Sequence, residues 1–178
     1  GTARAQAILT GTGFGRNATG ISGSVGGRCA AVAVWDGGLL AGAGATLEVW
    51  DCGNRLALAR LGQLRMPGLI ESIAAAGTFA FVACGSAGVQ FVDLADPSSP
   101  IHTATYDTSG HAFGLFVSGT LLFVADGTAG LRIVNVATPA TPHLVGAWFT
   151  GGPARAVAVD GTRAYIVDAE EGLRVLDV

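Results

Sequence analysis

The sequence predicts an all-β fold assembled from one repeated unit of 42 residues. An apolar run ends in an acidic or amide residue at Asp51, Asp93, Asn135 and Asp177, each 42 residues after the last. A glycine-centred turn separates two apolar runs in every unit, and no stretch shows a sustained helical period. Self-similarity at a period near 40 is typical of a modular repeat fold.

Each unit is expected to begin with a β-hairpin, because a tight turn there needs a glycine with positive φ. The four turns are Asp36-Gly37-Gly38, Ala76-Gly77-Thr78, Ser118-Gly119-Thr120 and Asp160-Gly161-Thr162. The next strands are rich in β-branched and aromatic residues and lie at 79–84, 121–126 and 164–168. The third strands start after a second glycine, at 89–94, 131–136 and 173–178.

A pair of prolines predicts a corner before the outer strand of the unit. Pro97 and Pro100 stand in one unit, and Pro139 and Pro142 stand in the following unit, ahead of an apolar run at 144–149. Proline has no N–H to donate to a β-ladder, so these residues belong to an extended corner. Four antiparallel strands in 40 to 45 residues make one blade of a β-propeller.

Three of the units share a more specific pattern. An apolar run is followed by Gly-Leu or Gly-Val, then by a run ending in Asp or Asn, and in two units by Pro-x-x-Pro; the first runs are Phe81-Val82-Ala83, Phe123-Val124-Ala125-Asp126 and Tyr165-Ile166-Val167-Asp168. The pattern resembles LVIVD repeats, which are bacterial and archaeal β-propeller repeats. The resemblance covers roughly residues 30–178 and departs in the first copy, where Arg55 and Leu58 stand in place of the two prolines. It implies a propeller in an exported or cell-surface protein, and it implies no particular activity.

The order of the strands bears on how the propeller closes. We expect one domain with four repeats at about 29–68, 69–110, 111–152 and 153–178, the last of which ends after its third strand. Residues 5–10 precede the first inner strand, which is the place of an outer strand, so 1–28 is expected to hold a strand closing the last blade and a Gly-rich loop. The ring is then four-bladed within one chain, or eight-bladed and shared between two chains, or part of a longer array.

Composition and charge argue against several classes of partner. Half of the residues are apolar, 13% are charged, and the net charge is −3 with ten Lys and Arg, so no basic stripe is expected to bind nucleic acid. The apolar runs are about six residues long, far below the roughly 20 that a spanning helix needs, which predicts no membrane insertion. No signal peptide is recognisable in the sequence. The three cysteines, Cys29, Cys52 and Cys84, lack metal-ligand spacing, and we expect no metal and no cofactor.

One rim of the propeller carries the candidate ligand-binding residues. Asp126 and Asp168 end the second strands of successive blades, Glu71 and Arg155 begin inner strands, and His111 lies close to such a start. Together they are predicted to line one mouth of the central channel. A structural alternative is that each aspartate caps its own loop and that the other residues pair with one another. None of them is assigned as catalytic.

Two functions remain after this reading. The preferred one is a non-catalytic interaction or assembly module that contacts a protein partner or a second copy of itself, because polar clustering is weak and the loops are short. The alternative is a propeller that binds a small ligand or a cation, or acts as an enzyme, at the channel mouth. Fold analogy cannot choose among enzymatic chemistries, and an enzyme is the less favoured reading.

Overall fold

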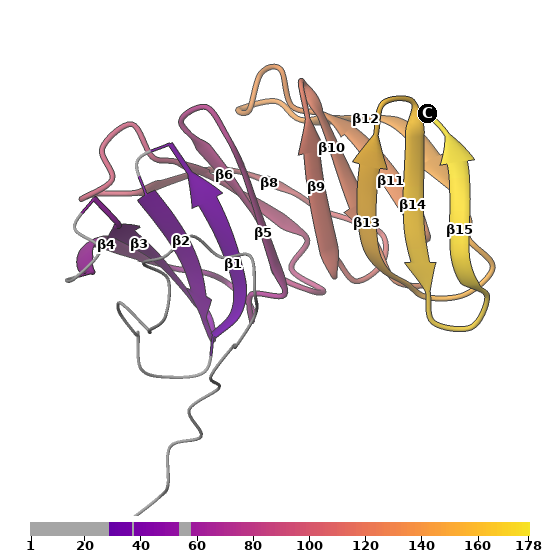
Figure 1. Ribbon diagram of the computed structural model, residues 1–178, viewed down its shortest axis with the longest axis horizontal. Coiled ribbons are helices and arrows are strands. Elements are labelled where there is room, and N and C mark those ends of the chain that lie inside the picture. Colours follow the sequence, from indigo (N-terminus) through magenta and orange to yellow (C-terminus); the bar gives the residue numbers. More distant parts are fainter. Residues whose placement is uncertain (1–28, 37, 54–57) are drawn as a thin grey trace, which may run out of the picture.

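The computed structural model describes residues 29–36, 38–53 and 58–178. These residues form fifteen β-strands in four antiparallel sheets and contain no helix (Figure 1). Within each sheet the strands lie in chain order, so each sheet is a meander of neighbouring hairpins. The expected all-β propeller with four blades is confirmed.

The blades are numbered in chain order. Blade 1 contains β1 (Cys29–Trp35), β2 (Gly38–Ala43), β3 (Thr46–Asp51) and β4 (Ala59–Arg65). Blade 2 contains β5 (Ser72–Ala76), β6 (Phe79–Ala83), β7 (Val89–Asp93) and β8 (Ile101–Tyr106). Blade 3 contains β9 (Gly114–Ser118), β10 (Leu121–Ala125), β11 (Leu131–Asn135) and β12 (His143–Trp148). Blade 4 contains β13 (Ala154–Asp160), β14 (Arg163–Asp168) and β15 (Gly172–Asp177).

Local chemistry explains the regular turns and bends. The predicted hairpin glycines Gly77, Gly119 and Gly161 have φ between +56° and +58°, a region that favours glycine. Every outer strand also pairs with its third strand through a bulge at the same repeat position, between the residues Val49/Trp50, Phe91/Val92 and Ile133/Val134. A bulge bends the strand locally, so each outer strand turns away from the sheet at the same point.

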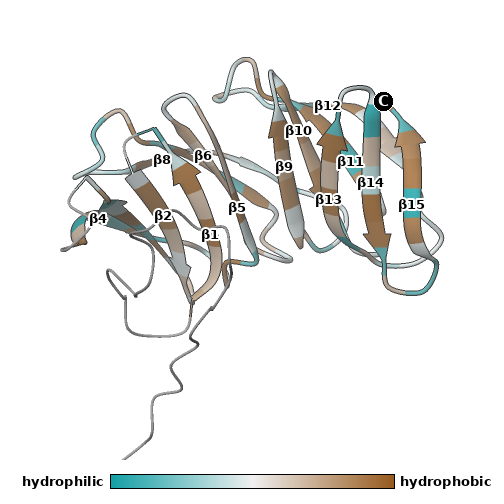
Figure 2. Ribbon diagram, viewed as in Figure 1, coloured by the Kyte–Doolittle hydropathy of each residue, from teal (hydrophilic) through white to brown (hydrophobic). Residues whose placement is uncertain are grey.

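The core lies between the blades, because each sheet buries both of its faces against a neighbour. Phe81 and Phe91 of blade 2 meet edge to face with ring centroids 5.2 Å apart, and both pack toward Leu122 and Val124 of blade 3. Figure 2 shows the apolar colouring along most strands and polar colouring at many of the connections. Burial of each such side chain stabilises the fold by about 1.5–3 kcal/mol.

Neighbouring inner strands hold the row of blades together. β1 contacts β5, β5 contacts β9, and β9 contacts β13. The indole N–H of Trp35 in β1 also donates a hydrogen bond of 2.9 Å to the carbonyl of Gly77 in the hairpin of blade 2. Blade 1 and blade 4 lie at opposite ends of the molecule, so the described residues form an open arc (Figure 1).

Two further expectations meet the structure at its ends and its cysteines. The expected closing strand at 5–10 lies outside the described residues, as does the Gly-rich stretch that follows it. Cys29 is exposed, Cys84 is buried, and all three thiols are free. In the described ranges no helix has the length and apolar character to cross a membrane.

Candidate functional site

Loops of one blade position the entry of the next blade at the candidate rim. The loop after β6 pairs with the segment before β9, where the Ala112 N–H donates to the Gly85 carbonyl at 3.1 Å. The loop after β10 pairs in the same way with β13, where the Ala154 N–H donates to the Gly127 carbonyl at 2.9 Å. A repeated bridge of this kind fixes the residues that begin each inner strand at the same height on the rim.

Four side chains from three successive blades form a surface row along this rim, which we call the rim row: Glu71, His111, Phe113 and Arg155. The His111 Nε2 lies 3.8 Å from Glu71 Oε1, so blade 2 and blade 3 meet through a polar contact. The imidazole stacks on the Phe113 ring with centroids 4.1 Å apart and planes tilted by 35°. The Arg155 guanidinium lies 4.0 Å from the Phe113 centroid, which is a cation–π contact.

Asp126 lies beneath this row and is fully buried. Its Oδ2 accepts the Gly110 N–H at 3.0 Å and lies 3.7 Å from Arg132 Nε, whereas its Oδ1 has no hydrogen-bond partner. Burial raises the pKa of Asp126 above its usual value, although the Thr108 hydroxyl, the Gly110 amide and the Arg132 charge act in the opposite direction. The buried Asp126 carboxylate is therefore incompletely satisfied.

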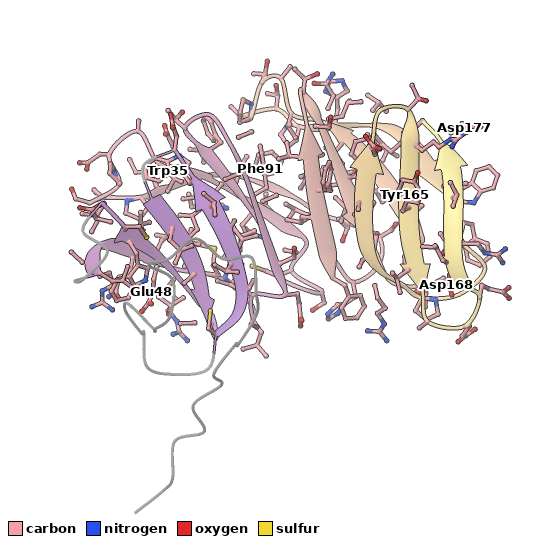
Figure 3. All side chains as sticks on the ribbon, viewed as in Figure 1. Trp35, Glu48, Phe91, Tyr165, Asp168 and Asp177 are labelled. Atoms are coloured by element: carbon pink, nitrogen blue, oxygen red, sulfur yellow. The ribbon has the colours of Figure 1, made fainter. Side chains whose placement is uncertain are left out.

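Asp168 occupies the equivalent place in blade 4 and is also buried. Its Oδ1 accepts the amides of Glu170 and Glu171 at 2.9 and 3.0 Å, and its Oδ2 accepts the Gly152 amide at 2.9 Å. Burial alone would raise the pKa of Asp168, but these bonds and the nearby Thr150 hydroxyl outweigh it and lower the pKa. Figure 3 shows Asp168 at the opposite end of blade 4 from Asp177.

The five predicted residues thus occupy two layers. Glu71, His111 and Arg155 belong to the surface row, while Asp126 and Asp168 lie below it and bond to loop amides. Their common role as ligand-binding residues stays a prediction. Phe113 was missed as a site residue although it stands 42 residues after Glu71 and 42 before Arg155. That spacing was the signal that could have added it.

The rim row combines opposite charges with an aromatic ring. One carboxylate, one guanidinium and one imidazole surround Phe113, which suits contact with a small group that carries both charges. Among the residues that the structure describes, no group of three or more His, Cys, Asp or Glu side chains could hold a metal ion.

The two ends of the arc present a different kind of surface. Val167, Leu173 and Val175 of blade 4 are 48%, 65% and 52% exposed. The residues at the same repeat positions in blades 2 and 3 pack between blades; they are Ala83, Val89 and Phe91, and Ala125, Leu131 and Ile133. We call the set Val167, Leu173 and Val175 the C-face.

Blade 1 carries the complementary surface. Ala31, Ala33 and Trp35 of β1 pack toward blade 2, and the alternation of the strand turns Val32 and Val34 the other way. Val32 and Val34 are 63% and 83% exposed. Their equivalents in the other inner strands pack against the preceding blade; they are Ile73 and Ala75, Leu115 and Val117, and Val157 and Val159. We call Val32 and Val34 the N-face.

Four-stranded antiparallel sheets packed in a row through repeat-equivalent faces define a β-propeller repeat protein. The LVIVD repeat family matches residues 67–108, 109–150 and 151–178, which is more than half of the chain. The protein therefore belongs to the LVIVD repeat family.

Comparison with solved structures agrees with this fold. The computationally designed Ika4 protein is 13% identical with a TM-score of 0.70, over 87% of this chain and 94% of that chain. The computationally designed Ika8 protein is 11% identical with a TM-score of 0.69, over 84% of this chain and 46% of that chain. Both are designed propellers, and at these identities the likeness concerns the fold alone. A search of curated proteins found no match.

Proposed function

We propose that the protein is a non-catalytic propeller module whose function is assembly, in which the C-face of one copy packs on the N-face of a second copy. One observation carries the proposal. Positions that pack between blades at the three internal interfaces are exposed and still apolar at the two ends of the arc. Exposed apolar patches built like an interface mark association sites.

The geometry of the proposed contact follows from the repeat. Because the C-face equivalents always pack against the N-face equivalents of the next blade, a second copy would continue the row in the same direction. Such a head-to-tail contact forms either a closed ring or an extending chain of copies. The 46% coverage of the Ika8 chain is compatible with four blades as half of a larger ring, although the Ika4 chain is matched almost whole.

The decisive experiment is the solution mass of three variants by light scattering. Val34→Asp damages only the N-face and Leu173→Asp damages only the C-face. A charge placed in either contact should weaken association by about 3 kcal/mol, or about 100-fold. Each variant alone should therefore be monomeric, and Ile101→Asp, which replaces an exposed residue of β8 away from both faces, should associate like the parent.

Mixing the two damaged variants gives a sharper test. The intact C-face of Val34→Asp can pair with the intact N-face of Leu173→Asp, so the mixture should form a one-to-one dimer that neither variant forms alone. A parent chain that stays monomeric at every concentration would refute the assembly function. A mixture that stays monomeric would refute the head-to-tail arrangement.

A second candidate function rests on the rim row. The contacts among Glu71, His111, Phe113 and Arg155 present both charges beside an aromatic ring, which fits a zwitterionic ligand such as a short peptide. Binding of zwitterionic dipeptides would be measured by calorimetry with the parent chain and with Arg155→Gln. Binding to the parent that is weakened by the substitution would favour this function, and no binding to the parent would reject it for this ligand class.

A further inference from the structure

The outer edge of β15 differs from the edges of the other third strands. β3, β7 and β11 each pair with a strand on both sides, whereas β15 pairs only with β14 among the described strands. The N–H and C=O groups on the other edge of β15 are therefore in position to bond an added strand. An unpaired edge of this kind is a template for strand addition.

An apolar groove runs beside this edge. A cavity of about 530 Å³ lies between β15 and β12, and Leu131, Trp148, Val175 and Leu176 are among its lining residues. A second cavity of about 360 Å³ continues past Phe149 and shares three of its lining residues with the first, namely Trp148, Val175 and Leu176. Trp148 is 55% exposed although it borders both cavities. The groove thus offers apolar contacts to an extended segment that pairs with β15.

The outer strands of the other blades show which sequence fits such a place. Each carries a small residue, one further residue and then a large apolar residue: Gly62-Gln63-Leu64, Ala104-Thr105-Tyr106 and Gly146-Ala147-Trp148. Leu64 and Tyr106 pack at the interface with the next blade. Ala7-Ile8-Leu9 has the same order of sizes. In the strand alternation, Leu9 would face the next blade and Ile8 would face the groove.

Chain order identifies the blade that this segment would complete. An outer strand always precedes the inner strand of the next blade, and the described connections between them are five to seven residues long. Residues 11–28 separate 5–10 from β1 and are long enough for the same crossing. Residues 5–10 therefore suit the blade in front of blade 1, which in the proposed assembly is blade 4 of another copy.

We propose that residues 5–10 of a second copy bind along β15 as the antiparallel fourth strand of blade 4. The inference rests on the proposed assembly and adds exchange of a named segment to the packing of the two faces. The segment lies outside the described residues, so the argument depends on its sequence, its position in the chain and the edge that it would fill.

Hydrogen exchange of the β15 amides in the full-length chain tests the proposal. The amides of β15 that do not bond to β14 should be protected in the assembled parent, and Ile8→Pro should accelerate their exchange at least about 100-fold because proline disrupts the pairing. Ala18→Pro, outside the proposed strand, is the matched control and should leave the protection unchanged. Trp148 fluorescence should shift to longer wavelength in Ile8→Pro alone.

Leu173→Asp separates this proposal from the assembly on which it rests. In this monomeric variant the outer amides of β15 should lose protection, since the strand comes from another copy. Protection that persists in the monomer would show that the strand comes from the same chain and would overturn the proposal. An assembled parent without protection at β15 would also overturn it, while the packing of the two faces would stand.

Discussion

Asp126 and Asp168 occupy the same place in successive blades, yet only Asp168 has both carboxylate oxygens hydrogen-bonded. The neighbouring loops explain the difference. The Gly127 N–H after Asp126 donates to the Ala154 carbonyl of blade 4, and the Ala129 N–H donates to the main chain of Asp126. The amides of Glu170 and Glu171 instead bond the side chain of Asp168. The same residue type therefore contributes differently to stability in the two blades.

Replacement of each aspartate by asparagine should have unequal effects on thermal stability. Asp168→Asn removes an acceptor that serves loop amides, so it should lower Tm by several degrees. Asp126→Asn removes a buried charge whose Oδ1 has no partner, so it should change Tm little or raise it. Calorimetric melting of the two variants checks this order, and equal losses of Tm would contradict it.

The two carboxyl groups should also respond oppositely to pH. The pKa of Asp168 is lowered by folding, so its stabilising contribution is present above the unfolded pKa of about 3.9 and is lost as pH falls through the folded pKa. The pKa of Asp126 is raised, so stability should decrease as pH rises from about 3.9 through the folded pKa. Melting curves against pH should show a weaker acid-side loss in Asp168→Asn. In Asp126→Asn the loss with rising pH should disappear.

Two glycines in outer strands predict opposite results for one substitution. A Cβ at Gly62 would lie 2.4 Å from the Pro97 carbonyl oxygen, whereas a Cβ at Gly146 would meet nothing closer than 3.4 Å, on Ile133. Gly62→Ala should therefore reduce the free energy of unfolding by about 2 kcal/mol through overpacking. Gly146→Ala should be neutral or stabilise by up to about 1 kcal/mol. Denaturant titration compares them, and equal midpoints would contradict the prediction.

The three thiols should differ in reactivity. Burial raises the pKa of Cys84 to about 11, helped by the charge of Glu71 and opposed by a backbone hydrogen bond at Gly68, and the thiol is 3% exposed. At pH 7 only about one Cys84 in ten thousand would be a thiolate. Aromatic disulfide reagents should label the exposed Cys29 first and should modify Cys84 only on unfolding. Peptide mass analysis after timed quenching would identify the sites, and early modification of Cys84 would refute this order.

The repeat order was predictable because one spacing recurs in turns, strand ends and proline corners. The hairpin glycines and the four blades follow from that spacing alone. The contacts of the rim row were not predictable, since the stacking of His111 on Phe113 depends on the offset between neighbouring blades. The difference between Asp126 and Asp168 was equally hidden, because it depends on where the loop amides find acceptors.

The bridge from Trp35 to Gly77 and its neighbours join each blade only to the adjacent ones. A duplication or deletion of one whole 42-residue unit would therefore place every strand against a surface of the kind that it already contacts. Proteins of this architecture can change length in evolution by whole blades without redesign of the remaining core. Insertions of other lengths would fall on strands and reverse the faces of their side chains.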